Sequence, residues 1–165
     1  MGHAKTRSAL TTRHASKARL ALPLALALFA APALAQTPPE AQWRPASEIA
    51  THLAENGFRV MKLDREHDGY EADLIDRQGN RVEARVNPVT AELVSTKSEG
   101  RAGPVHEQWL TLAQVARHLE GKGFTVRKIE TEASGYEADL TDRGGARTEA
   151  KIDPMSGEIL ASKPD

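Results

Sequence analysis

Acidic residues two positions apart occur twice in this sequence, within the same hexapeptide, GYEADL. One copy contains Glu71 and Asp73, and the other contains Glu137 and Asp139. Because side chains two apart on a strand share a face, each pair would present two carboxylates side by side. Such a pair can carry out general acid–base chemistry or bind Ca²⁺. We favour the alternative, a solvated outer face of a half-buried sheet, which the pairs would share with Glu83, Glu149, Arg77, Arg81 and Arg85.

Histidine and tryptophan also recur at equivalent positions. His52 and His118 could together bind a metal ion. Neither belongs to an HExxH pattern, so we expect histidines at the surface or at the core edge. Trp43 and Trp109 could form a recognition spot or pack where a helix begins, and we favour packing.

No other catalytic pattern is present in the sequence. The chain has no cysteine, and it contains no GxSxG, P-loop or dinucleotide-binding pattern. We therefore predict that the protein is not an enzyme. We assign it no cofactor and no catalytic, cofactor-binding or metal-binding residue.

These candidate residues belong to an internal duplication. Aligning Trp43 with Trp109 superposes residues 43–97 on residues 109–163 without a gap, and 24 of the 55 paired positions are identical. Residues 98–108 contain two glycines and a proline, which is typical of a linker. Residues 36–42 form a Pro-containing lead-in. The sequence therefore predicts two tandem small domains, residues 43–97 and 109–163.

Each repeat is predicted to contain one helix followed by an antiparallel meander of about four strands. Residues 47–56 carry apolar side chains at helical spacing, and Ser47 could cap this helix. The segments that follow, such as YEADLIDR and RVEARV, alternate apolar and charged residues, which indicates a sheet with one buried face. The helix should cover that face, so the predicted fold class is α+β.

Within this pattern, the residues of GYEADL have structural roles. Gly69 and Gly135 are expected to supply a positive φ at the hairpins. Tyr70 and Tyr136 are expected to be core aromatics with an outward hydroxyl.

The first 35 residues have the pattern of a secretory signal peptide. Five basic residues and no acidic one occupy residues 1–19, and the apolar run LALPLALALFAAP follows. This run is short for a bilayer span, which needs about 20 residues. Ala33 and Ala35 flank Leu34 as in a signal-peptidase site, so we predict cleavage before Gln36. We expect a periplasmic or secreted protein with no membrane anchor after cleavage.

Cleavage would leave an acidic protein. The chain has 22 basic and 23 acidic residues, and removal of the leader leaves 17 basic residues, a net charge of −6 with His neutral. A nucleic-acid partner would select a basic face, so we expect none.

The second repeat, GYEADLTDRGGARTEAKIDPMSGEIL, resembles the signature of the PepSY domain family. The resemblance rests on Tyr136, Glu137, Asp153, Pro154, Gly157, Glu158, Ile159 and Leu160. The first repeat matches at Tyr70, Glu71, Pro88, Glu92 and Leu93, but it has Asn87 for the Asp and Ala91 for the Gly. Both repeats, and so nearly all of the chain after the leader, are covered.

The resemblance implies a binding role. PepSY domains occur in propeptides of thermolysin-type metallopeptidases, where they are associated with inhibition, and in small secreted or periplasmic proteins. The family has no catalytic residues to carry over. We therefore expect an exported protein that binds a secreted or periplasmic peptidase as its protein partner and inhibits or regulates it.

Two other functions fit the residues. One is a small-ligand or cation-binding envelope module that uses the acidic sheet face, and the other is a purely structural envelope protein. The sequence leaves the oligomeric state open.

Overall fold

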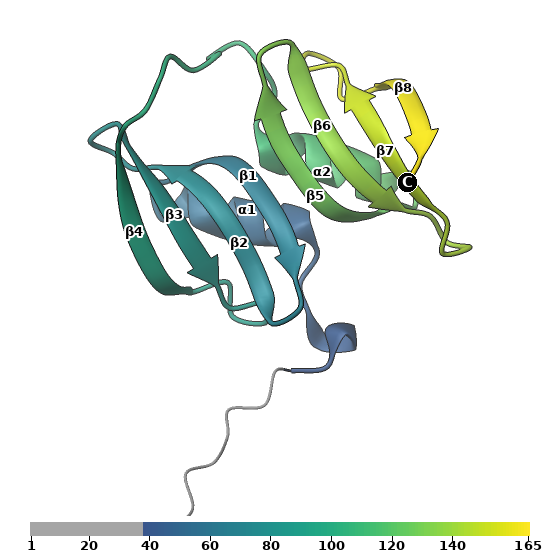
Figure 1. Cartoon of the computed structure of the whole chain (residues 1–165), viewed down its shortest axis with the longest axis horizontal. Coiled ribbons are helices and arrows are strands. Elements are labelled where there is room, and N and C mark those ends of the chain that lie inside the picture. Colours follow the sequence, from purple (N-terminus) through teal and green to yellow (C-terminus); the bar gives the residue numbers. More distant parts are fainter. Residues whose placement is uncertain (1–37) are drawn as a thin grey trace, which may run out of the picture. The chain divides into compact units, whose positions relative to one another are not determined.

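The computed structural model describes residues 38–165. The expected leader and the cleavage site before Gln36 lie outside these residues. The described part has two α-helices, one short 3-10 helix and one sheet, which Figure 1 shows. The predicted α+β class is confirmed.

Each repeat contains the predicted helix and the predicted four-stranded meander. The first repeat has a 3-10 helix η1 (Glu40–Gln42), helix α1 (Ala46–Glu55) and strands β1 (Arg59–Glu66), β2 (Gly69–Ile75), β3 (Asn80–Val86) and β4 (Leu93–Arg101). The second repeat has helix α2 (Leu112–Gly121) and strands β5 (Thr125–Glu132), β6 (Gly135–Thr141), β7 (Arg147–Ile152) and β8 (Ile159–Pro164). Strand β4 continues past residue 97 into the segment predicted as linker.

The two meanders are not separate sheets, and this contact between the tandem small domains was not predicted from the sequence. They form one antiparallel eight-stranded sheet in the order β4-β3-β2-β1-β5-β6-β7-β8. Pairing of β1 with β5 joins the repeats and satisfies backbone groups that would otherwise lie at an exposed sheet edge. Residues 38–165 lie within one compact unit.

The register of β1 against β5 relates the repeats by an approximate two-fold axis. Leu63 lies opposite Ile129, and the repeat alignment also pairs Leu63 with Ile129. On either side, Lys62 lies opposite Glu130 and Asp64 lies opposite Lys128, so each cross-strand pair joins opposite charges. The axis therefore passes between Leu63 and Ile129.

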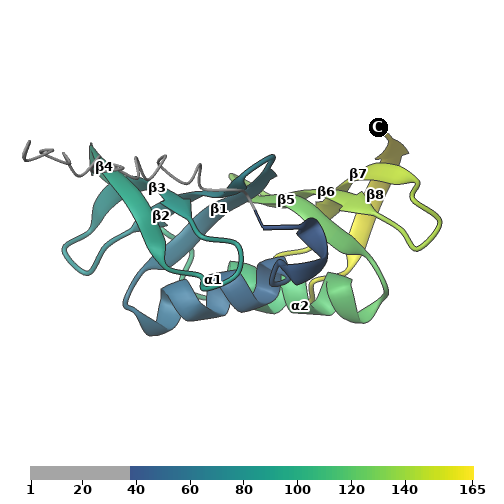
Figure 2. The ribbon, with the colours of Figure 1, turned by 90° about the horizontal axis from the view of Figure 1, so that it is seen from below.

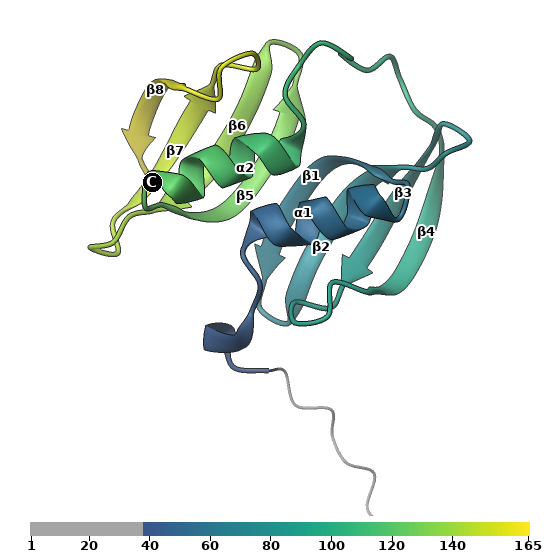
Figure 3. The same ribbon diagram turned by 180° about the vertical axis from the view of Figure 1, so that it is seen from behind.

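Both helices cover the same face of the sheet, as Figures 2 and 3 show. The side chains that alternate inward are buried at matching positions of the two repeats, for example Leu63 and Ile129, Leu74 and Leu140, and Val86 and Ile152. A β-bulge at the same place in β1 and β5 turns Val60 and Val126 toward this core as well. Within residues 38–165, no helix covers the other face of the sheet.

The two helices begin differently, and Ser47 does not cap α1 as we predicted. Pro45 occupies the N-cap position of α1, and Ser47 lies inside the helix, where it is buried. Helix α2 begins with a complete capping box: the side chain of Thr111 accepts from the backbone N–H of Gln114, whose side chain accepts from the N–H of Thr111. Helix α1 therefore depends on another acceptor.

A positive φ and crowding both favour glycine at the hairpins. Gly69 and Gly135 have the expected positive φ, at 159° and 156°. A Cβ at Gly69 would lie 2.8 Å from the carbonyl oxygen of Val86, and one at Gly135 would lie 2.6 Å from that of Ile152. Only glycine allows the hairpin to approach the neighbouring strand this closely.

Candidate functional site

The acidic pairs lie on the face of the sheet opposite helices α1 and α2, and they are interleaved with basic residues. Glu71 and Asp73 alternate with the buried residues of β2, so they point away from the helices. Lys62 Nζ lies 3.1 Å from Glu71 Oε1, and Arg81 Nη2 lies 3.3 Å from Asp73 Oδ2. In the second repeat, Lys151 pairs with Glu137.

Asp139 and Glu137 experience different surroundings on that face. The hydrogen bond from Lys151 lowers the pKa of Glu137, although burial acts in the opposite direction. Partial burial raises the pKa of Asp139, and the positive charge of Lys128 only partly offsets this. Within residues 38–165, no three His, Cys, Asp or Glu side chains are placed to hold a metal ion together.

The repeated histidines have separate roles at the surface. His118 Nε2 lies 3.1 Å from Glu158 Oε1, so in the second repeat this side chain joins α2 to the turn before β8. His52 is half-buried on α1, and its backbone carbonyl accepts from the side chain of Asn56.

The two tyrosines are core aromatics, as predicted, but their hydroxyls are not free. Tyr70 Oη donates to the carbonyl of Arg44 at 2.9 Å, and Tyr136 Oη donates to the carbonyl of Leu110. Both bonds tie the second strand of a meander to the segment that precedes its helix. Burial raises the pKa of both phenols, so they stay protonated donors at neutral pH.

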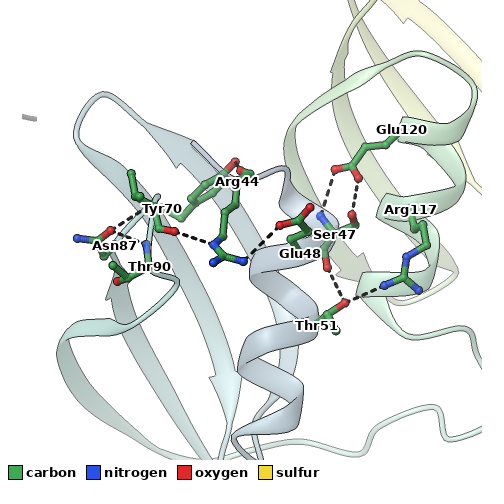
Figure 4. Close-up of polar contacts among 10 residues, drawn as sticks. Arg44, Ser47, Glu48, Thr51, Tyr70, Asn87, Thr90, Arg117 and Glu120 are labelled. Carbon is green, nitrogen blue, oxygen red and sulfur yellow. Dashed lines mark hydrogen bonds and ion pairs between the residues drawn. The ribbon is translucent and has the colours of Figure 1, made fainter. Parts of the chain in front are cut away.

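Helices α1 and α2 pack antiparallel, and one end of this pair is closed by polar contacts (Figure 4). The backbone N–H of Ser47 donates to Glu120 Oε1 at 3.1 Å, and the Ser47 hydroxyl donates to the other carboxylate oxygen. One turn further, Arg117 Nη2 donates to Thr51 Oγ1 at 3.0 Å. Glu120 of α2 therefore supplies the acceptor that the start of α1 lacks.

A second cluster of charges fills the same end. Arg65 stacks over the Trp43 ring at 4.7 Å, and its Nη2 atom lies 3.3 Å from Glu40 Oε2. Arg127 Nη1 approaches the same oxygen at 4.0 Å. We call this end, with Glu40, Ser47, Arg65, Glu120 and Arg127, the closed end.

The opposite end of the helix pair contains a cavity of about 290 Å³. Its lining comes from both repeats and from the linker: Ala50, Ala54, Phe58, Arg59, Val60, Met61, His106, Glu107, Trp109, Thr111, Leu112, Ala113, Thr131 and Tyr136. We call this end the open end. The axis that relates the repeats exchanges the two ends, so each lining residue has a counterpart at the closed end.

Sequence reasoning missed this cavity because it followed the identities between the repeats. The signal lay in the differences: Thr131 aligns with Arg65, Met61 with Arg127, and Ala54 with Glu120. Three large charged residues of the closed end, Arg65, Arg127 and Glu120, thus have smaller or uncharged counterparts at the open end. The two tryptophans also differ between the ends. Trp43 is buried at the closed end, whereas Trp109 lines the cavity and stacks on His106 with 3.9 Å between the ring centroids.

Strands β4 and β8 are the two edges of the sheet. Strand β4 is nine residues long and contains no proline. Strand β8 is six residues long and includes Pro164. Each carries one exposed apolar residue at equivalent positions, Val94 in β4 at 69% exposure and Leu160 in β8 at 65%.

Comparison with known proteins agrees with the duplicated fold. The family described as peptidase propeptide and YPEB domain matches residues 19–97 and 102–163. The chain therefore belongs to this family, as a tandem pair of PepSY domains, and the resemblance inferred from the sequence is confirmed. The first match begins inside the expected leader.

Other comparisons add little. A candidate lipoprotein from Clostridium difficile 630, known from its crystal structure, aligns over 74% of this chain and 95% of its own, with 13% identity and a TM-score of 0.45. No curated protein matched the chain. Neither helix in residues 38–165 has the length and apolar character needed to cross a membrane.

Proposed function

We propose that this chain is an exported, non-enzymatic protein that binds a secreted or periplasmic peptidase and regulates it through the edge of strand β4. The observation that carries the proposal is a nine-residue edge strand, whose outer side pairs with no other strand of residues 38–165, in a member of a peptidase propeptide family. An extended segment of a partner can pair with such an edge by main-chain hydrogen bonds.

Strand β4 suits this role better than β8. Pro164 has no N–H to donate, so it shortens the ladder that β8 could offer. Val94 on β4 adds an exposed apolar contact next to the free backbone groups. The edge that β1 would present in a single repeat pairs with β5, so within residues 38–165 the remaining sheet edge of the first repeat is β4.

The leader supports export. Its basic start, its apolar run and Ala33 and Ala35 predict that the exported protein begins at Gln36. Intact-mass measurement of protein purified from cells that express the full chain tests this part of the proposal directly.

The main test is peptidase inhibition. The purified protein is added to the exported proteins of the source organism, and cleavage of a fluorogenic peptide is followed. We expect a saturable loss of activity. Val94→Lys should weaken it at least about tenfold, because a charge at the edge opposes strand pairing. Leu160→Lys, the matched change on β8, should leave inhibition unchanged.

The outcomes separate the parts of the proposal. No loss of cleavage at micromolar protein would show that inhibition is not the main role. Equal effects of the two lysine variants would show that the peptidase binds elsewhere than β4.

A further inference from the structure

We propose that the cavity at the open end binds a small amphipathic carboxylate, a molecule with an apolar body and one anionic group. This inference goes beyond the proposed function and does not depend on it. It rests on the comparison of the two ends of the helix pair, on the chemistry of the cavity wall and on the position of Arg59.

The first step is that the counterpart of this cavity is filled. At the closed end, Arg65 and Arg127 reach Glu40, and Glu120 bonds to Ser47. At the open end, the residues aligned with Arg65, Arg127 and Glu120 are Thr131, Met61 and Ala54, and all three line the cavity. At the closed end, the side chains of Arg65, Arg127 and Glu120 therefore fill the space between the elements. At the open end, the same backbone arrangement leaves the equivalent space as a cavity.

The second step is that the wall suits an apolar body. Phe58, Met61, Trp109 and Leu112 contribute aromatic and aliphatic surface from both repeats. Ligand cavities in proteins are mostly apolar with a few polar groups, and their volumes begin near 300 Å³. A cavity of about 290 Å³ is therefore sized for a medium-chain fatty acid or a small aromatic acid.

The third step is that Arg59 selects an anion. Its counterpart at the closed end is Thr125, so this cation is present only at the open end. The side chain is half-buried in the wall, and Nη2 donates to the carbonyl of His106 at 2.8 Å, which fixes the guanidinium and leaves other N–H groups to bind a carboxylate.

Two other titratable groups face the cavity from the linker. His106 is exposed and stacked on Trp109, and Glu107 is also exposed. Water screens the charge of Glu107 more strongly than that of the half-buried Arg59. Arg59 therefore dominates the charge preference of the site.

The test uses Trp109 as the reporter. The chain has two tryptophans, and only Trp109 lines the cavity, so the Trp43→Phe protein reports on this site alone. Sodium decanoate is titrated while Trp109 fluorescence is followed, and calorimetry on the unmodified protein gives a second readout. We expect a saturable change with half-saturation below about 1 mM.

Three variants in the same background define the site. Arg59→Gln should weaken decanoate binding about tenfold, because a charge-assisted hydrogen bond is lost. Arg127→Gln removes the same charge at the closed end and should leave binding unchanged. Thr131→Arg places the closed-end residue in the cavity and should abolish binding. If its circular dichroism shows misfolding, Met61→Arg, the other closed-end residue, replaces it.

Several results would overturn the proposal. One is the absence of saturable binding in both readouts with folded protein. Another is equal binding of decanol or decylamine, which would show that the site does not select an anion. A third is undiminished binding by a folded variant with arginine at position 131 or 61.

Discussion

At the scale of single residues, the identities and the differences between the repeats have separate functions. Shared residues such as Tyr70 and Tyr136 build the same core and the same hydrogen bond twice. Differing residues, above all Glu120 against Ala54, decide which end of the helix pair is closed. Ala91 is a further difference: it adopts a φ of 64° where the second repeat has Gly157.

A prediction at this scale concerns Gly135. In the Gly135→Ala variant, the new Cβ would meet the carbonyl oxygen of Ile152 at 2.6 Å, so the hairpin must move from its neighbouring strand. We expect the free energy of unfolding to fall by about 2 kcal/mol, the size typical of backbone strain. Gly103→Ala is the control, because its Cβ would meet no atom within 4 Å. Equal unfolding midpoints in urea for the two variants would contradict the crowding argument.

At the scale of elements, the two helices solve the same problem in different ways. Every helix start leaves backbone N–H groups without intrahelical partners. Helix α2 satisfies them locally with Thr111 and Gln114. Helix α1 follows Pro45, whose side chain cannot accept a hydrogen bond, and Glu120 from the other repeat takes that role at the N–H of Ser47. The carboxylate also lies favourably at the positive end of the helix dipole.

Glu120→Ala tests this cap across the repeats. Loss of the acceptor should destabilise the protein by about 1 to 2 kcal/mol, the usual cost of removing an N-cap. Glu55→Ala, at an exposed position of α1, is the matched control and should change stability by less than about 0.5 kcal/mol. Chemical denaturation measures both. Similar losses in the two variants would mean that Glu120 contributes only as an ordinary surface residue.

At the scale of the whole described chain, duplication has produced one continuous sheet that the two PepSY domains share. A single repeat of about 55 residues buries a small core and would expose the edge of β1 or β5. Pairing of β1 with β5, together with packing of α1 on α2, joins the two cores. The cavity exists because this pairing is symmetric in the backbone but not in the side chains.

One cooperative unfolding transition is therefore expected. The Trp43→Phe variant keeps only Trp109, in the second repeat, and the Trp109→Phe variant keeps only Trp43, in the first. The fluorescence of each variant therefore reports on one repeat. For each variant, the unfolding midpoint measured by fluorescence should coincide with the midpoint measured by circular dichroism. Comparing the two probes on the same variant removes any effect of the substitution on stability. A repeat that melted separately would show that the shared sheet does not couple the two halves.

The sequence by itself determined the duplication, the helix and strands of each repeat, the α+β class and the family. These follow from local signals: a period of two in the strands, helical spacing in residues 47–56, and turn residues between them. Tertiary structure alone decided that β1 pairs with β5, that Ser47 is a helix residue capped by Glu120, and that a cavity remains at one end. Those features join residues about 70 positions apart, as Ser47 and Glu120 are, and no local pattern encodes which distant surfaces meet. The repeat alignment showed which residues differ, but only the two-fold arrangement in the tertiary structure showed that they lie at opposite ends of the helix pair.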